Sequence, residues 1–315
     1  MQRKCLILSL TTKDDYALAE WRKNGVDTDL TLKDIPKALR LLRRFWIRWH
    51  LPLQSIWYGD WKKSFWQYDF VLVHGTWLAE DVPHWMKKIA SQKGAFPKLV
   101  WWYWNTVVEK DHPDRVSQQD CEKWSFDQGD CKKYGMRHNT QYYFKSFQLP
   151  QVSLTTDVYF LGSDGGRMDT LLDLEKKWKA MGIRTDFHIV VKHISDAYKN
   201  RKAVTTKHFS YTENLEHIAA SKAVLEILRP GQAGQTLRAL ECLFFGKKLI
   251  TNDKSVMQQV YYHPDNIFVL GEDAEEKLSD FLEKPFFAEN KKYCDYFDCK
   301  QWLERFWEEN DGARK

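Results

Sequence analysis

Residues 223–251 read AVLEILRPGQAGQTLRALECLFFGKKLIT, and this stretch decides the fold. Its apolar start, 223–228, predicts a buried strand, and the run 229–235, which contains a proline and two glycines, predicts a loop. Residues 236–245 have helical spacing and precede a glycine, and 247–251 predict a second strand. A strand, a loop, a helix and a strand in this order indicate a parallel sheet with helices on its faces.

The same order of elements extends to both sides of this stretch. Apolar runs predict strands at 156–161, 186–191 and 267–270. After the first of these strands, a glycine-rich loop at 162–167 leads into an amphipathic helix at 168–181, which a glycine ends. The second half of the chain therefore predicts one continuous α/β domain.

The first half alternates in the same way. Strands are predicted at 4–10, 68–73 and 98–104, and a helix at 81–92 has a proline in its first turn. We therefore predict an α/β protein with two Rossmann-like domains that face each other across a cleft. The predicted parts are an N-terminal domain, 1–150, a C-terminal domain, 151–299, and a C-terminal helix, 300–315, that packs back on the N-terminal domain.

Charge and composition limit the partners of the chain. Its 315 residues suffice for two domains of about 150 residues each. With 48 Lys and Arg against 43 Asp and Glu, the net charge is only +5, so nucleic acid is not expected as the main partner. The chain has 15 tryptophans, and three of them stand with a tyrosine at 101–104. Aromatic residues in this number predict either core packing or stacking on a sugar face.

The sequence also indicates a compartment. The apolar run at 5–10 is too short for a signal peptide and has no small-residue cleavage site after it. The sequence has no run of about 18 apolar residues, so no transmembrane helix is expected. The six cysteines have no zinc-binding spacing, which favours free thiols in a reducing cytoplasm and predicts no metal site.

Two loops predict an anion site, because each follows a strand and opens a helix of the same domain. In an open parallel sheet, ligands bind beyond the carboxyl ends of the strands, where helix N-termini favour anions. In the first loop Arg167 is unfavourable at a helix start unless an anion offsets its charge. Glu241, amid apolar neighbours in the helix after the second loop, is either a surface glutamate or a carboxylate that accepts two hydrogen bonds from a ribose diol.

These segments resemble a known family. Residues 229–251 are similar to the donor-site segment of GT-B glycosyltransferases, and more narrowly to bacterial enzymes of lipopolysaccharide and capsule synthesis. Residues 160–167, with the helix and strand after them, resemble the opening βαβ unit of that family, so the resemblance covers about 156–271. It implies a glycosyltransferase that moves a sugar from a nucleotide-diphosphate sugar to a cell-surface glycan or lipid-linked acceptor. The C-terminal domain would bind the donor and the N-terminal domain the acceptor.

The resemblance also implies roles for single residues. Glu241 matches the glutamate that binds the donor ribose, and Arg167 and Arg229 would stabilise the leaving diphosphate. The family often has a second glutamate eight positions earlier, where this chain has Ala233, so neither retaining nor inverting stereochemistry is assigned. Asp164 is the only carboxylate of the two loops, so metal-independent catalysis without a cofactor is expected. The full predicted donor set is Gly162, Ser163, Arg167, Arg229, Gln232, Gly234, Gln235, Thr236 and Glu241.

A catalytic base is predicted less sharply. His74 follows a buried strand, and an imidazole can take a hydroxyl proton near neutral pH. Asp14, Asp15 and Glu109 are the alternatives, and a purely structural role for His74 stays open.

The segment Lys37–Trp49 has two interpretations. Its basic residues lie opposite an apolar stripe that ends at Trp49, which is typical of helices at an anionic membrane surface, here the inner face of the cell membrane. A stripe of this kind is also what a helix packed on a sheet requires, and we favour that interpretation. The basic residues are Lys37, Arg40, Arg43, Arg44 and Arg48, and the apolar ones Leu39, Leu42, Phe45 and Trp49.

Two other functions compete with the transferase. An NAD-dependent oxidoreductase needs a Gly-x-Gly-x-x-Gly turn, whose spacing 162–167 lacks. A non-catalytic protein that binds glycans or nucleotides, or acts as a scaffold, can have the same fold, because a fold does not determine activity.

Overall fold

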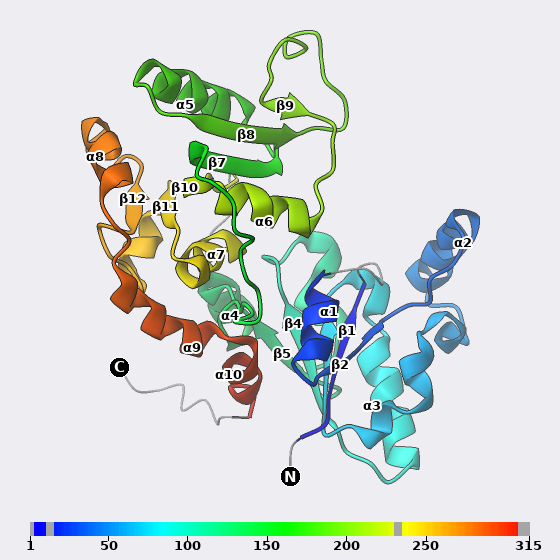
Figure 1. Cartoon of the computed structure of the whole chain (residues 1–315). Helices are drawn as coiled ribbons and strands as arrows, with labels where there is room; N and C mark the ends of the chain where they lie inside the picture. Colours follow the sequence, from blue (N-terminus) through cyan, green and yellow to red (C-terminus); the bar gives the residue numbers. More distant parts are fainter. Residues whose placement is uncertain (1–2, 11–15, 230–234, 308–315) are drawn as a thin grey trace. The chain divides into compact units, whose positions relative to one another are not determined.

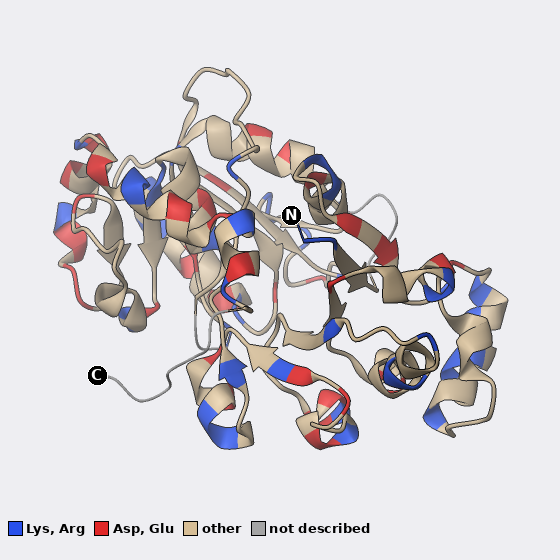
Figure 2. Cartoon of the chain, turned by 90° about the horizontal axis from the view of Figure 1, so that it is seen from below, with Lys and Arg blue, Asp and Glu red and all other residues tan. Residues whose placement is uncertain are grey.

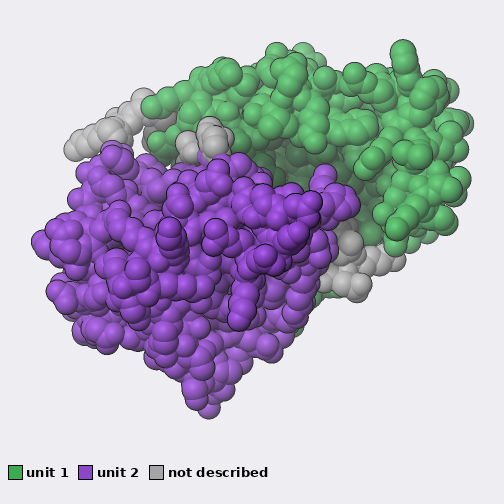
Figure 3. Space-filling model, turned by 90° about the horizontal axis from the view of Figure 1, so that it is seen from above, with its two compact units in different colours: residues 1–140, 303–315 green, residues 141–302 purple. Residues whose placement is uncertain are grey.

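The computed structural model describes residues 3–10, 16–229 and 235–307. The chain divides into two compact units, residues 1–140 with 303–315 and residues 141–302, which Figure 3 shows in two colours. The domain limits expected from the sequence, after residues 150 and 299, stay a prediction, because compactness alone does not define independently folding domains.

Each unit has one six-stranded parallel sheet, so the prediction of two Rossmann-like α/β domains is confirmed. In unit 1 the strand order is β2-β1-β3-β4-β5-β6 (Figure 1). The elements of this unit are β1 Cys5–Ser9, α1 Tyr16–Lys23, β2 Asp27–Leu30, α2 Lys37–Arg48, β3 Phe70–His74, α3 Val82–Gln92, β4 Lys98–Tyr103, β5 Glu122–Ser125, α4 Gln128–Tyr134 and β6 Arg137–His138.

In unit 2 the strand order is β12-β11-β10-β7-β8-β9. Strands β8 and β9 therefore follow β7 on one side, and β10, β11 and β12 follow on its other side. The direction reverses between β7 and β10, which pair with each other. The elements are β7 Thr156–Ser163, α5 Met168–Ala180, β8 Thr185–Val190, β9 Val204–Thr205, α6 Tyr211–Ala219, β10 Ser221–Glu226, α7 Leu237–Phe245, β11 Lys248–Thr251, β12 Ile267–Val269, α8 Leu278–Glu283, α9 Cys294–Phe297 and α10 Cys299–Glu304.

Two apolar clusters fill the two faces of the unit 2 sheet. Alternate residues of the central strands face opposite ways, because successive side chains of a strand do so. Val158 and Phe160 pack with α5 and α8, whereas Tyr159 and Val224 pack with α6 and α7. The helices therefore cover both faces, and ligands of such sheets bind beyond the carboxyl ends of the strands.

The tryptophans of unit 1 belong mainly to its core. Trp101 and Trp102 of β4 and Trp124 of β5 are at most 2% exposed. Phe306, also buried, contacts Trp124 at 4.8 Å between ring centroids. Trp101 and Trp102 therefore serve core packing, the first of the two interpretations of the aromatic run at 101–104.

Helix α2 contradicts the expectation that it packs on the sheet. Of its residues only Ile47 is buried, while Leu42 is 47% and Phe45 56% exposed. Short 3₁₀ turns between 54 and 67 supply Tyr58, Trp61 and Phe65 to the core of unit 1, so the apolar stripe of α2 has no place in it. Lys and Arg recur along this helix (Figure 2). Among the helices that the structure describes, none has the length and apolar character to span a membrane.

Candidate donor site at the switch point of unit 2

The candidate site lies where β7 and β10 pair and the strand order reverses. At such a switch point two loops diverge from adjacent strand ends and leave room for a ligand. Gly162 and Ser163 are the last two residues of β7, Arg167 ends the loop that follows it, and Arg229 lies in the loop after β10. The strand order therefore places the first loop and Arg229, the described start of the second loop, at one edge of one sheet.

The first loop is held by Asp164, whose Oδ1 accepts the amide hydrogens of Arg167 at 3.2 Å and Met168 at 2.9 Å. The carboxylate therefore satisfies amides at the N-terminus of α5 that the sequence interpretation reserved for a phosphate. Gly165 has a φ of 54°, in the left-handed region, and a Cβ on it would lie 2.8 Å from Nε of Arg229. Glycine is needed here because the Arg229 side chain lies against the loop.

Arg167 joins the two strand ends. Its guanidinium donates to the carbonyl oxygens of Ser163 at 2.5 Å and Asp164 at 3.1 Å, and to that of Ile227 just beyond β10. Burial lowers the pKa of Arg167, as do the nearby charges of Arg229 and Arg238. Since main-chain carbonyls are its hydrogen-bond acceptors, its positive charge stays available to an anion.

Arg229 is exposed and lies next to Arg167. Its Nη2 donates to Oγ of Ser163 at 2.7 Å, so Ser163, Arg167 and Arg229 are in one contact group. This group brings three residues of the predicted donor set together.

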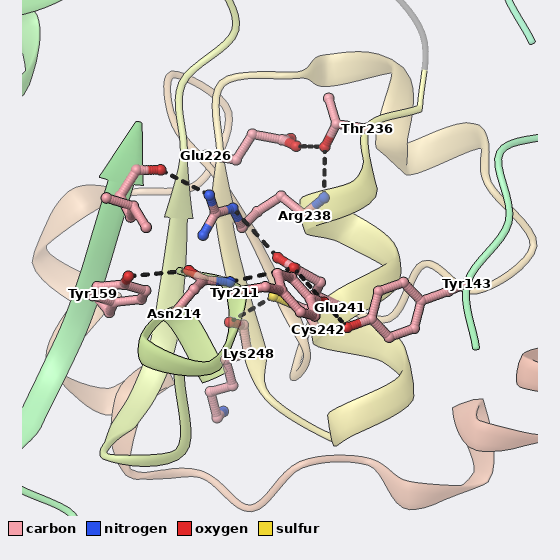
Figure 4. Close-up of polar contacts among 11 residues, drawn as sticks. Tyr143, Tyr159, Tyr211, Asn214, Glu226, Thr236, Arg238, Glu241, Cys242 and Lys248 are labelled. Carbon is pink, nitrogen blue, oxygen red and sulfur yellow. Dashed lines mark hydrogen bonds and ion pairs between the residues drawn. The ribbon is translucent and has the colours of Figure 1, made fainter. Parts of the chain in front are cut away.

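Arg238, which the sequence analysis did not select, is a third cation of the site (Figure 4). Its Nη2 donates to the carbonyl of Leu161 at 2.8 Å, and its Nε lies 3.7 Å from Oε2 of Glu241. Its Nη1 is buried, with no hydrogen-bond acceptor among the residues that the structure describes. The signal for it was the spacing of three residues to Glu241, which places both side chains on one face of α7.

Glu241 is only 6% exposed, so it is not a surface residue. Its Oε1 accepts a hydrogen bond from the hydroxyl of Tyr211 at 3.0 Å and from Nδ2 of Asn214 at 3.5 Å. Burial raises its pKa, although Arg238 acts in the opposite direction. Glu241 and Arg167 belong to one cluster through Arg238, whose charge acts on both.

Glu226 is a second buried carboxyl group that the sequence analysis missed. It ends β10 and accepts hydrogen bonds from the hydroxyls of Thr251, at 2.6 Å, and Thr236. Thr236 also caps α7 by accepting the amide hydrogen of Arg238 at 3.1 Å. Burial raises the pKa of Glu226. The predicted residue Thr236 therefore orients the start of α7.

The other predicted donor residues have separate places. Gln235 donates to the hydroxyl of Tyr261 at 3.1 Å and so contacts a different group from the arginines. Gln232 and Gly234 lie outside the described residues.

The candidate base belongs to unit 1. His74 ends β3, and its ring stacks on Trp104 with 5.5 Å between centroids. Burial lowers the pKa of His74 to about 4, so the imidazole is neutral at pH 7. Its Nε2 is buried and has no hydrogen-bond partner in the described part of the chain. Of the alternative bases, Glu109 begins an exposed 3₁₀ turn, and Asp14 and Asp15 lie outside the described residues.

A groove of about 830 Å³ lies at the opposite edge of the unit 2 sheet. Ser221, Lys222 and Lys248, at the amino ends of β10 and β11, line it. Lys222 is paired with Asp157 at 3.1 Å and Glu283 at 2.5 Å. The groove therefore does not belong to the site at the carboxyl ends.

Comparisons with known proteins give little further information. No family model and no curated protein matches the sequence. Among solved structures, MurG of Acinetobacter baumannii is 8% identical, with 96% of this chain and 98% of that chain covered and a TM-score of 0.40. A D-lactate dehydrogenase from Sporolactobacillus sp. is 11% identical, with 99% and 98% covered and a TM-score of 0.24. At these identities and TM-scores neither likeness decides the function.

Proposed function

We propose that this chain is a GT-B type glycosyltransferase that moves a sugar from a nucleotide-diphosphate sugar to a cell-surface glycan or a lipid-linked acceptor. One observation carries the proposal: Arg167, Arg229 and Arg238 meet at the switch point of unit 2, where parallel α/β sheets bind ligands. Three guanidinium groups beside one another repel unless an anion or buried carboxyl groups offset them. Glu241 pairs with Arg238 at 3.7 Å, and the carboxylates of Asp164 and Glu226 act on Arg167, so a bound diphosphate would add to this offset.

The arginines suit the chemistry of the leaving group. When the bond between the sugar and the diphosphate breaks, negative charge develops on the diphosphate oxygens. Fixed positive charges placed there stabilise the transition state more than the bound donor. Arg167 is held by three carbonyls and is therefore preorganised, whereas exposed Arg229 can reorient from Ser163 to the ligand. Catalysis of this kind requires neither a metal nor a cofactor at the diphosphate.

Glu241 would bind the donor ribose. Its Oε1 already accepts from Tyr211, so a ribose diol would replace that hydroxyl or bind to Oε2, the oxygen nearer Arg238. An ionised carboxylate has about four lone-pair sites, enough for both partners. The pair with Arg238 favours the ionised form that this role needs.

His74 would take the proton of the acceptor hydroxyl. Its low pKa leaves it unprotonated at pH 7, and the Nε2 atom has an unused lone pair or proton. A base with a pKa of about 4 is weak, so most of the rate would come from alignment and from the arginines.

Helix α2 would place the protein at the inner face of the cell membrane. Leu41 is 70%, Phe45 56% and Trp49 66% exposed, and basic residues flank them. An exposed apolar stripe beside basic residues fits the boundary between anionic headgroups and acyl chains. This location would suit a lipid-linked acceptor.

A non-catalytic nucleotide-binding protein is the second candidate. Asp164 occupies the amides of Arg167 and Met168, which many phosphate-binding loops leave to the ligand. This observation favours a loop that is complete without a diphosphate. The two candidates differ in turnover, not in fold.

Calorimetric titration of the chain with UDP, GDP, CMP and dTDP sugars tests the proposal, followed by mass-spectrometric detection of donor hydrolysis. The transferase predicts that one donor binds, is slowly hydrolysed, and binds more weakly to Arg229→Ala than to Arg229→Lys. Binding without hydrolysis or transfer to any acceptor would favour the second candidate. If no donor binds, both fail.

A further inference from the structure

Unit 2 contains a second group of polar side chains, away from the arginines. Asp186 and His188 come from β8 and His217 from α6. One possible ligand atom from each lies within 4.8 Å of the other two. It is the one such group of three histidine, cysteine or acidic residues among the described parts of the chain.

The fold places these three residues together for simple reasons. Asp186 and His188 are two positions apart in a strand, so they point to the same face of the sheet. The intervening Phe187 is buried on the other face, in the cluster that contains α5. Helix α6 covers the face of Asp186, and its His217 comes next to the carboxylate.

The contacts of Asp186 leave one histidine poorly satisfied. Nδ1 of His217 lies 2.6 Å from Oδ2 and forms a hydrogen bond, with one of the two groups as donor. Nε2 of His188 lies 2.8 Å from Oδ1, yet this buried atom forms no aligned hydrogen bond within the described residues. Asp186 therefore pairs with both imidazoles, one through each carboxylate oxygen, and, against the opposing effect of burial, both histidines lower its pKa.

Aromatic rings surround the three polar side chains. The ring of Tyr159 stacks on His217 with 5.2 Å between centroids and 6° between planes. The ring of Phe209 contacts His188 at 4.6 Å. These rings orient the two imidazoles, while the three polar side chains stay partly exposed and accessible to an ion.

We propose that Asp186, His188 and His217 bind a divalent transition-metal ion of the zinc class. Two imidazoles and one carboxylate suit zinc and its neighbours, and they leave a fourth tetrahedral position for water or another ligand. Ligand atoms around tetrahedral zinc are roughly 3.3 Å apart, so the two close contacts of Asp186, at 2.6 and 2.8 Å, need to open by about 0.5–0.7 Å. This ion would be separate from the diphosphate, and it departs from the expectation that the chain has no metal site.

The ion would act on the proposed donor site through α6. The hydroxyl of Tyr159 donates to Oδ1 of Asn214 at 3.0 Å, and Nδ2 of Asn214 lies 3.5 Å from Glu241 (Figure 4). Helix α6 carries Asn214 and His217 together with Tyr211, the other partner of Glu241. A metal that ties α6 to β8 would therefore fix both partners of Glu241.

Metal titration of the full chain, without an affinity tag and after treatment with a chelator, tests the proposal. We expect calorimetry to detect one Zn²⁺ ion per chain, bound at micromolar concentration or tighter, and an increase in the melting temperature. His217→Ala and Asp186→Asn should each weaken binding at least tenfold. His193→Ala, which changes an exposed histidine of the same unit, should bind like the unchanged chain.

A second measurement separates this group from the six cysteines and from misfolded variants. The Co²⁺-loaded unchanged chain should have the visible absorption of a nitrogen and oxygen site, without the thiolate charge-transfer band that cysteine ligands produce. Failure of the unchanged chain to bind Zn²⁺, a thiolate band, or equal binding by a folded His217→Ala variant would each overturn the proposal. Donor binding is measured in its own titrations, so failure of the metal proposal and failure of the donor proposal are distinguished.

Discussion

The switch points of the two units differ in charge. In unit 2 the paired strands are β7 and β10. Arg167, Arg229 and Arg238 lie near their carboxyl ends, together with the buried carboxyl groups of Glu226 and Glu241. In unit 1 the paired strands are β1 and β3, and β3 ends at a neutral histidine stacked on Trp104. The same topology thus places charged side chains at the described strand ends of unit 2 and a neutral histidine, stacked on a tryptophan, at the end of β3; most of the loop after β1 lies outside the described residues. Topology determines where a ligand binds, and the side chains at the strand ends determine which one.

The largest expected effect comes from removing the carboxylate of unit 2. Glu241→Ala leaves Arg238 buried without its counter-charge, and breaking a buried pair costs about 3–5 kcal/mol. Denaturant unfolding should detect this loss, and donor affinity should fall far more than in His74→Ala. Glu241→Gln, which keeps an acceptor for Tyr211, should lose less stability. Equal donor affinity in Glu241→Ala and His74→Ala would contradict the assigned ribose site.

The next effect belongs to the neutral histidine of unit 1. The pKa of His74 is about 4 in the folded chain, against a reference value of 6.5. Between pH 4 and 6.5 the unfolded chain therefore binds a proton at this histidine and the folded chain does not. Its contribution therefore reduces stability as the pH falls from about 6.5 to 4, by about 3 kcal/mol at the lower end. The free energy of unfolding is measured against pH for the unchanged chain and for His74→Asn. The difference between the two curves isolates the contribution of His74 from that of the other histidines. A difference that does not change with pH would mean that His74 is not buried as a neutral group.

Single arginines of unit 2 should have smaller but separable effects. Arg167→Ala should weaken donor binding about 100-fold, because it removes a preorganised charge worth about 2.7 kcal/mol in a charge-assisted contact. Arg229→Ala should cost about tenfold, and less at high salt, because exposed charges are screened. Arg201→Ala, an exposed arginine of the same unit, serves as the control. An equal loss in all three variants would indicate only a general effect of net charge.

The smallest effect per residue concerns α2 of unit 1. Co-sedimentation with vesicles that contain anionic lipid should fall at least tenfold when Leu41, Phe45 and Trp49 are all changed to Asp, since three apolar contacts are lost. Phe96→Asp changes a residue that is 87% exposed elsewhere in unit 1 and should have no effect. The unchanged chain and Phe96→Asp should both bind neutral vesicles more weakly than vesicles that contain anionic lipid. If the triple variant sediments like the unchanged chain, α2 is not the lipid contact.

Much of the fold could be predicted because its signals are local. The apolar runs at 68–73 and 156–161 predicted the buried strands β3 and β7, and Gly246 ends α7 in the left-handed conformation with a φ of 67°. The position of Arg167 at a helix start also indicated an anion site. These features depend on residues within one or two turns of each other.

Other parts of the site could not be predicted, because they depend on residues distant in the sequence. Arg238 contacts the carbonyl of Leu161, 77 positions earlier, and Asp186 meets His217 across 31 positions. Only the strand order creates these contacts. Helix α2 illustrates the same limit, since a period of 3.6 residues predicts an apolar face but not what covers it.

The sequence by itself determined two α/β units with parallel strands and, in unit 2, two loops after strands that carry Arg167 and Arg229. Local periodicity and turn chemistry are enough for that, because strands and helices follow from neighbouring residues. Only the tertiary structure decided that Asp164 closes the first loop, that Glu241 is buried under Tyr211, and that β8 and α6 bring two histidines to one carboxylate. These contacts exist because packing brings side chains from distant elements within hydrogen-bond distance.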